Sequence, residues 1–216
     1  MKTATRYRPL LKKMKRIHYF SGLTLTLFIG IHLANHFASF WGAESHIEFM
    51  EMVRPIYRNV IIETLLLLAV GVQIISGIKL LRTKRKVING FYEKLQLRTG
   101  LYMAFFLLIH VGAVLSGRFI LDLDTNFYFG VAGLNTFPFN LFFLPYYGFA
   151  ILSFFGHIAS IHHAKMNTEL FGFSVKRQSN LILFTGIVLT LSLMYGLTNG
   201  FSGVEIPEEY HILIGK

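Results

Sequence analysis

The chain of 216 residues contains no cysteine. Without a thiol it can form no disulfide, no thiolate metal site, no iron–sulfur cluster of its own and no covalent c-type haem attachment. Charged residues are also scarce, at 15% of the chain, whereas 53% of the residues are hydrophobic and 22 are phenylalanine. A soluble domain of this length normally carries more charge and fewer aromatic residues. The composition therefore indicates an all-α, polytopic membrane protein.

The N-terminal region also lacks the small-residue cleavage site that follows the short apolar core of a secretory signal peptide. We therefore expect the first apolar segment to be retained. The net charge of +10 is typical of a nucleic-acid-binding protein. The basic residues, however, lie between the apolar segments, so membrane topology accounts for them and no nucleic-acid partner is expected.

Five apolar segments are long enough to cross a bilayer, because about 20 helical residues span a hydrocarbon core of about 30 Å. We expect one bundle of five transmembrane helices that forms a single domain over residues 1–216. The predicted spans are 17–41, 59–81, 99–118, 138–162 and 179–200.

The segments between the spans differ in character. Residues 42–59 have apolar positions at helical spacing and predict a short interfacial helix. Residues 122–140 are rich in turn formers and aromatic side chains, which favours an ordered loop. The last residues, 203–216, begin polar and are expected to lie on the surface.

Lys and Arg residues are distributed unevenly over the two sides of the predicted bundle. Sixteen lie in the segments on one side and four in those on the other, namely 1–17, 82–98 and 163–178 against 42–58, 118–137 and 201–216. Because basic residues stay inside, this asymmetry predicts a cytoplasmic N-terminus and an external C-terminus. The expected location is the bacterial cytoplasmic membrane.

Two histidines lie at similar depth in different predicted spans, His32 in the first and His110 in the third. Such a pair suits a b-type haem, because each imidazole offers one nitrogen to the iron from opposite faces of the macrocycle. Interhelical hydrogen bonds between the histidines are the alternative interpretation. Four nearby small residues leave room for a flat macrocycle: Gly30, Ala34, Gly112 and Ala113.

His36 follows His32 by one helical turn and is expected near the outer interface, where it orients a propionate or substrate, or replaces His32 as the ligand. The segments HLANH and HIASIHH are similar to the histidine clusters of membrane di-iron enzymes. The predicted topology places these segments at opposite sides of the bilayer, which argues against a shared metal centre. Glu63, in the outer half of the second span, is a candidate for proton handling. A glutamate solvated by headgroups at the helix start is the alternative.

Seven segments, in this order, resemble the membrane anchor of succinate dehydrogenases and fumarate reductases of the single-chain, five-helix cytochrome b type. They are RIHYFSGL, HLANHF, WGAESHIEFME, IIETLLL, QIISG, LRTGLYMAFFLLIHV and GFAILSFFGHIA. The resemblance covers nearly the whole chain and implies two haem b groups stacked across the bilayer. It implies His32 and His110 as the ligands of the outer haem and His157 as a ligand of the inner one.

The second span contains no histidine. Where the family has its other inner ligand, four residues before Gly77, this chain has Gln73, whose amide is a poor ligand for iron compared with imidazole. Because of this departure from the family pattern, we expect one haem at the outer site. At the inner site the haem is absent, five-coordinate through His157, or completed by a neighbour such as His162.

The resemblance also implies a role. The chain would transfer electrons between an iron–sulfur subunit and membrane quinone, with that subunit and a flavoprotein bound to the inner face. Quinone is expected near the haem edges, with Glu63 handling quinol protons at the outer side and Arg16, His18 and Ser21 contacting quinone or a haem propionate at the inner side.

The chain has no flavin motif and no dicarboxylate site, so it would be a non-catalytic or quinone-reactive subunit, not a complete enzyme. A stand-alone haem-binding or structural membrane protein of the same fold is the alternative that Gln73 favours. A transporter would have paired helix breaks at the midplane, which the sequence does not contain.

Overall fold

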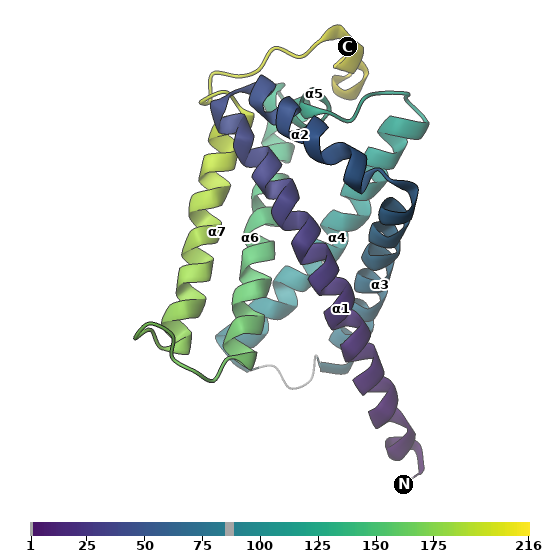
Figure 1. The fold of residues 1–216 in the computed structure, drawn as a ribbon, viewed down its shortest axis with the longest axis vertical. Helices are drawn as coiled ribbons and strands as arrows, with labels where there is room; N and C mark the ends of the chain where they lie inside the picture. The colour runs from purple at the N-terminus through teal and green to yellow at the C-terminus, as the bar shows by residue number, and fades with distance from the viewer. Residues whose placement is uncertain (1, 85–88) are drawn as a thin grey trace.

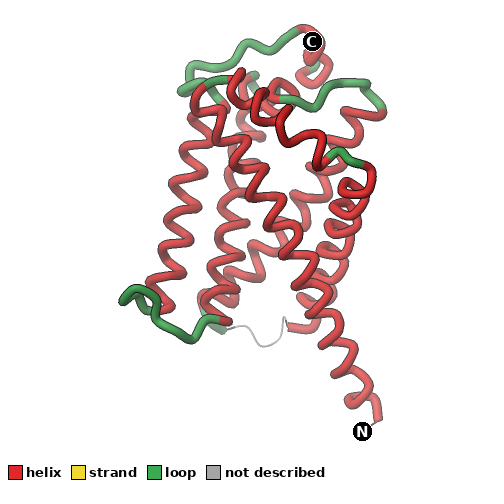
Figure 2. Tube along the Cα trace, in the orientation of Figure 1, coloured by secondary structure: helices red, strands yellow, loops and turns green. Residues whose placement is uncertain are grey.

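The structure is a computed structural model that describes residues 2–84 and 89–216, and it consists of helices joined by short loops (Figures 1 and 2). Over these residues the only β-type pairing is an isolated bridge between Leu170 and Phe173. The helices, in chain order, are α1 (Lys2–Ala38), η1 (Ser39–Trp41), α2 (Ala43–Tyr57), α3 (Val60–Lys84), α4 (Phe91–Phe119), α5 (Phe127–Val131), η2 (Gly133–Asn135), α6 (Asn140–Lys165), α7 (Val175–Leu197) and η3 (Glu208–Ile214).

Five of the described helices, α1, α3, α4, α6 and α7, are long and apolar enough to cross a membrane. This confirms the predicted all-α class with five spans. Helix α4 begins at Phe91, earlier than the predicted 99, because the Glu93 carboxylate accepts hydrogen bonds from the backbone N–H groups of Asn89 and Gly90 and caps the helix. Helix α7 begins at Val175, before the predicted 179, for a similar reason: the Ser174 hydroxyl accepts a hydrogen bond from the backbone N–H of Arg177 and caps the helix. Hydropathy marks the apolar part of such helices and misses their polar first turns.

The helices pack most closely in three pairs: α1 with α3, α4 with α6, and α6 with α7. Small residues permit this approach, as is common between helices in membranes. A Cβ added to Gly156 of α6 would lie 2.9 Å from the Thr99 side chain of α4, and one added to Gly186 of α7 would lie 2.5 Å from Phe155 of α6.

One end of the bundle is covered by α2, α5 and η3, and the C-terminus lies there, whereas the N-terminus lies at the other end (Figure 1). We call these the C-terminal end and the N-terminal end of the bundle. The predicted interfacial helix is α2. The expectation that residues 203–216 form only a surface segment is wrong, because Ile206, Tyr210 and Ile214 are buried in the main hydrophobic core. Tyr210 and Ile214 lie in η3, and Ile206 lies in the segment that precedes it.

The Tyr210 side chain is fully buried, and its hydroxyl donates to the backbone carbonyl of Asp124 at 3.1 Å. Burial raises the pKa of Tyr210, and the neighbouring Glu209 and Asp124 act in the same direction, so the hydroxyl stays protonated and keeps donating. This contact joins the C-terminal segment to the loop between α4 and α5.

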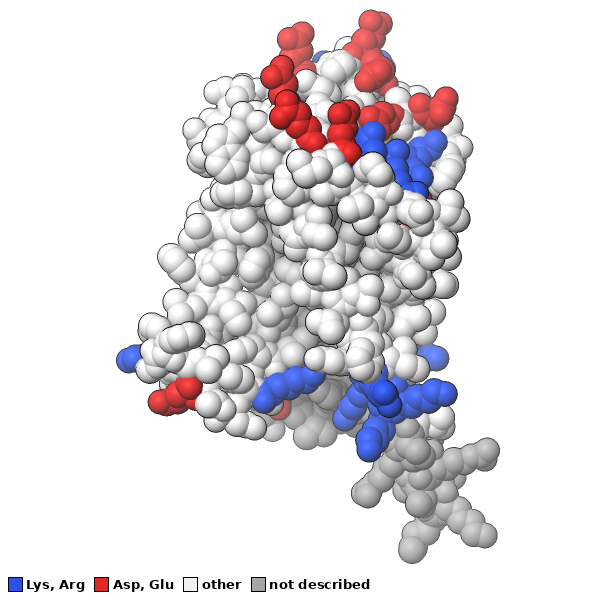
Figure 3. Space-filling view, viewed as in Figure 1, with Lys and Arg blue, Asp and Glu red and all other residues white. Residues whose placement is uncertain are grey.

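Charged side chains gather at the two ends of the face in Figure 3, with an uncharged band between them. Lys and Arg dominate the N-terminal end, and most of the acidic residues lie at the C-terminal end. Arg85 and Lys86, which contribute to the sequence-based topology, lie outside the described residues. The membrane orientation itself stays a prediction.

We expect Gly186→Ala to lower the thermal unfolding midpoint of the detergent-solubilised protein. The added methyl group would overpack the contact with Phe155, which typically costs about 1–3 kcal/mol. Gly71→Ala in α3 is the matched control, because a Cβ there would meet no atom within 4 Å and alanine favours the helix over glycine by up to about 1 kcal/mol. Equal midpoints for the two variants would contradict the close packing of α6 on α7.

Candidate functional site

Four histidines meet near the C-terminal end of the bundle. Helix α1 supplies His32 and His36, α2 supplies His46 and α4 supplies His110. The ring centroids of His32 and His110 are 6.1 Å apart, and those of His32 and His36 are 4.4 Å apart. The structure therefore brings together the predicted pair from the first and third spans, and it places His36 beside them.

Hydrogen bonds link three of these imidazoles in a row. His36 Nε2 lies 3.1 Å from His32 Nε2, and His46 Nε2 lies 3.2 Å from His36 Nδ1. In each pair, one nitrogen must donate and the other must accept. The hydrogen bonds of the row can therefore point in either of two directions. In one of them His36 donates to His32, and in the other His32 donates to His36.

His46 is the member of the cluster that the sequence did not single out. It is 3% exposed, and its Nδ1 atom finds no hydrogen-bond partner among the described residues; the same holds for Oδ1 of the adjacent Asn35. Burial lowers the pKa of His46 to about 4, and His32 acts in the same direction, so this imidazole is uncharged at neutral pH. The spacing of His46 and Met50 on the buried face of α2 is the sequence signal that points to it.

Aromatic rings enclose the predicted pair. Phe28 stacks on His32 at 5.8 Å between ring centroids, and Phe106 stacks on His110 at 4.9 Å. Tyr147 of α6 presents its ring edge to His110 at 6.2 Å. These contacts keep the two imidazoles in apolar surroundings, where a neutral ring is favoured over a charged one.

The spacing of His32 and His110 fits a haem. Two imidazoles that bind one iron at about 2 Å each hold their ring centres about 6 Å apart, close to the observed 6.1 Å. A Cβ added to Gly30 or Gly112 would meet no atom within 4 Å, so neither position is packed against a neighbouring helix. Nδ1 of His46 adds a buried polar atom that has no hydrogen-bond partner within the described part of the chain.

At the N-terminal end, α1 and α3 share a second polar group. Ser21 Oγ donates to Gln73 Oε1 at 2.7 Å, Gln73 Nε2 lies 3.3 Å from His18 Nε2, and His18 Nδ1 lies 2.8 Å from Ser76 Oγ. Three of the predicted inner-side residues, His18, Ser21 and Gln73, are therefore brought together. Arg16 is not part of this group, since its guanidinium lies over the Phe20 ring of its own helix.

His157 lies between α6 and α4. Its Nδ1 is 3.2 Å from the Gln96 carbonyl oxygen and 3.3 Å from Thr99 Oγ1. His162 lies about one and a half helical turns further along α6. Its side chain contacts α7, where its Nε2 is 2.8 Å from Gln178 Oε1. That amide oxygen accepts only, so His162 Nε2 carries the hydrogen and is not available as a ligand in this arrangement.

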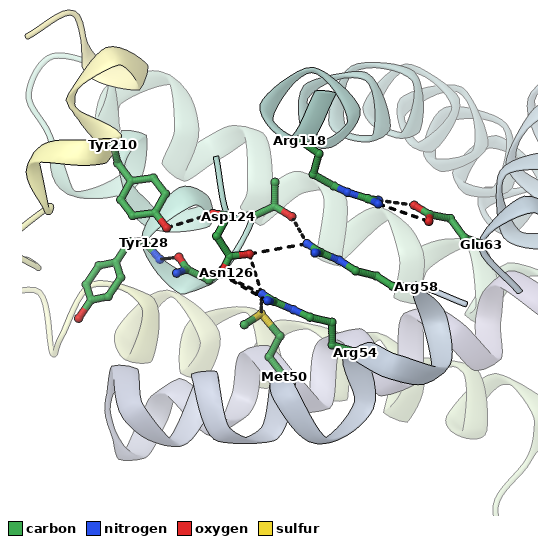
Figure 4. A network of polar contacts seen from close by, with 10 residues as sticks. Met50, Arg54, Arg58, Glu63, Arg118, Asp124, Asn126, Tyr128 and Tyr210 are labelled. Atoms are coloured by element: carbon green, nitrogen blue, oxygen red, sulfur yellow. Dashed lines mark hydrogen bonds and ion pairs between the residues drawn. The ribbon is translucent and has the colours of Figure 1, made fainter. Parts of the chain in front are cut away.

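A polar network crosses the C-terminal end (Figure 4). Glu63 at the start of α3 forms an ion pair with Arg118 of α4 that includes a second contact of 3.4 Å between Nη2 and Oε2. Beside it, Asp124 accepts from Arg54 at 2.9 Å and lies 3.8 Å from Arg58. Burial lowers the pKa of Arg58, as do Arg54 and Arg118. The sequence offered no cation for Glu63, because Arg118 is 55 residues away and the packing of α3 on α4 brings the two together.

A hollow of about 500 Å³ lies at the N-terminal end between α4 and α6. On its wall, the Tyr92 ring stacks on His163 at 3.9 Å between ring centroids, and the Tyr92 hydroxyl donates to Asn180 Oδ1 at 2.7 Å. His163 Nδ1 is buried and finds no partner among the described residues.

The comparisons with known proteins do not assign the chain to a family. No protein-family model, no curated protein and no solved structure matches it.

We expect Glu63→Gln to lower the free energy of unfolding by about 1–3 kcal/mol, between the values for exposed and buried ion pairs. The change leaves the Arg118 guanidinium, whose side chain is 18% exposed, without its carboxylate. Denaturant unfolding in mixed micelles measures the effect, with Glu48→Gln on the exposed face of α2 as the control. A double variant that adds Arg118→Gln should recover part of the loss. Strict additivity of the two single effects would show that the side chains do not interact.

Proposed function

We propose that this protein is a haem b-containing membrane anchor of a succinate:quinone oxidoreductase, which transfers electrons between an iron–sulfur subunit and membrane quinone. The observation that supports the proposal most directly is the pair of His32 and His110. These imidazoles come from two different membrane-spanning helices, and their ring centres are spaced as for two ligands of one iron. The resemblance of seven segments in the same order adds to it.

A bound haem would supply one-electron chemistry that no side chain of this chain offers. His32 and His110 would hold it, and the stacked rings of Phe28 and Phe106 would fix the planes of the two imidazoles. His36 lies 3.1 Å from His32 and serves as hydrogen-bond partner or as the replacement ligand. Partners of this kind fix the orientation of a ligand imidazole and tune its basicity.

Quinone chemistry moves protons together with electrons, so the protein needs groups that bind and release protons near its quinone sites. At the C-terminal end, Glu63 is the acidic candidate, and Arg118 holds its carboxylate at the start of α3. At the N-terminal end, Tyr92 and His163 line the hollow between α4 and α6, where a quinone headgroup would bind.

The proposed orientation follows the distribution of basic residues, with the N-terminal end facing the cytoplasm of a bacterial cell. The flavoprotein and iron–sulfur subunits would dock on that end. Purification of the tagged chain from its native membranes tests this part: a complex with flavin fluorescence and iron–sulfur electron paramagnetic resonance signals is expected. A chain that purifies alone with haem from intact membranes would favour the stand-alone alternative.

We expect the wild-type protein to contain haem b with a low-spin reduced-minus-oxidised spectrum, and His110→Ala to lose the haem held by His32 and His110. Pyridine haemochrome analysis of purified protein gives the haem-to-protein ratio. His211→Ala is the control, because His211 lies in η3 and its Nε2 contacts the Ile206 carbonyl, 3.1 Å away. A wild-type protein without haem would overturn the proposal, and a spectrum unchanged by His110→Ala would overturn the ligand assignment.

A further inference from the structure

Helix α7 stands at the edge of the bundle and packs mainly on α6 (Figure 1). Several of its large apolar side chains are exposed: Leu181, Phe184, Ile187, Val188 and Leu191. Because α7 is one of the five helices long and apolar enough to cross a membrane, these side chains face the acyl chains of lipids.

An open groove of about 300 Å³ lies on α7 at the N-terminal end of the bundle. Four of its lining residues are Arg177, Asn180, Leu181 and Phe184, whose i, i+3, i+4, i+7 spacing places them on one face of the helix. Phe173, from the loop between α6 and α7, completes the lining. The groove is therefore polar where α7 begins and apolar further along the helix.

The depths of these residues match the layers of one bilayer leaflet. Helix α7 has 23 residues and is about 35 Å long at 1.5 Å per residue, slightly longer than a hydrocarbon core of about 30 Å. With α7 centred in the membrane, Phe184 lies about 3 Å and Arg177 about 14 Å from the midplane. Side chains of a helix point toward its N-terminus, and long arginine side chains extend to the interface, so the Arg177 guanidinium reaches the headgroup layer.

The polar end of the groove carries hydrogen-bond donors. Arg177 is exposed, and its guanidinium forms no ion pair with any residue that the structure describes. Tyr92 of α4 orients Asn180, because its hydroxyl donates to Asn180 Oδ1 at 2.7 Å and leaves the Nδ2 hydrogens to donate elsewhere. A guanidinium beside an amide N–H group suits a phosphate, which is negatively charged and accepts hydrogen bonds.

The surroundings of the groove are basic. The last turn of α6, the following loop and the first turn of α7 include Lys165, Lys176 and Arg177 against one acidic residue, Glu169. Positive charge at the membrane surface attracts anionic lipids. Phe171 of the same loop is 98% exposed, as suits an aromatic side chain that enters the membrane interface.

We propose that this groove is a binding site for an anionic phospholipid. Arg177 and the Asn180 amide hold the phosphate of the lipid, and one of its acyl chains lies along Leu181 and Phe184. The site does not depend on the proposed function, because its lining residues belong neither to the histidine cluster nor to the hollow between α4 and α6.

Tryptophan fluorescence in reconstituted full-length protein tests this assignment. Trp41 is the only tryptophan and lies in η1, at the opposite end of the bundle, so Trp41→Phe with Phe184→Trp places the only tryptophan in the groove. Quenching by brominated phosphatidylglycerol, compared with brominated phosphatidylcholine of the same chain length, gives the relative affinity of the two lipids at this position.

We expect phosphatidylglycerol to bind more tightly than phosphatidylcholine at this reporter. Arg177→Gln should lower the preference by about fivefold, the factor that one cation at the membrane surface supplies. Arg177→Lys should keep most of the preference, because the positive charge remains.

The matched control is Trp41→Phe with Phe105→Trp, because Phe105 is half-exposed in the middle of α4. At that reporter we expect a weaker preference that Arg177→Gln does not change, which also reports that the variant is folded. Equal preferences at the two reporters would overturn the inference, as would a preference in the groove that survives Arg177→Gln. A groove reporter that neither lipid quenches would also overturn it and would indicate that a protein covers the groove.

Discussion

A neutral imidazole buried at membrane depth must give its N–H group to an acceptor, and this constraint determines how the helices of this protein pair. Water is absent from the hydrocarbon core, so the acceptor has to come from another helix or from the same one. His18 meets the requirement through Ser76 of α3, His157 through the Gln96 carbonyl of α4, and His162 through Gln178 of α7. Each such bond also fixes the register of two helices, because a shift by one residue would leave the imidazole without a partner.

The two ends of the bundle meet this constraint differently. At the N-terminal end His18 bonds to a serine hydroxyl and His157 to a backbone carbonyl, so the tautomers of these two imidazoles are fixed. At the C-terminal end His32, His36 and His46 bond to one another, so a change of tautomer in one ring changes the others. A row of this kind can pass a proton from one end to the other when all of its hydrogen bonds reverse their direction.

Periodicity and depth in the sequence predict the five spans and the pairing of His32 with His110, because both depend on distances along single helices. The predictions fail where a contact joins residues far apart in the chain. Arg118 next to Glu63 and His46 next to His36 depend on how separate helices pack, which a hydropathy pattern does not contain. The surface position predicted for the C-terminal residues is wrong because the polar start of the segment does not show that Ile206, Tyr210 and Ile214 pack into the main core.

The cover formed by α2, α5 and η3 has a consequence for what can reach the C-terminal histidines. A water-soluble molecule that approaches along the bundle axis meets this cover, in which the Phe127 ring is buried with its centroid 5.1 Å from that of His46 and the residues around Tyr210 are packed. A molecule dissolved in the bilayer meets instead the apolar, lipid-facing sides of α1 and α4, where Leu27 and Leu108 are exposed. The cover therefore hinders hydrophilic reaction partners at the aqueous face. The lateral route from the bilayer stays open to lipophilic ones.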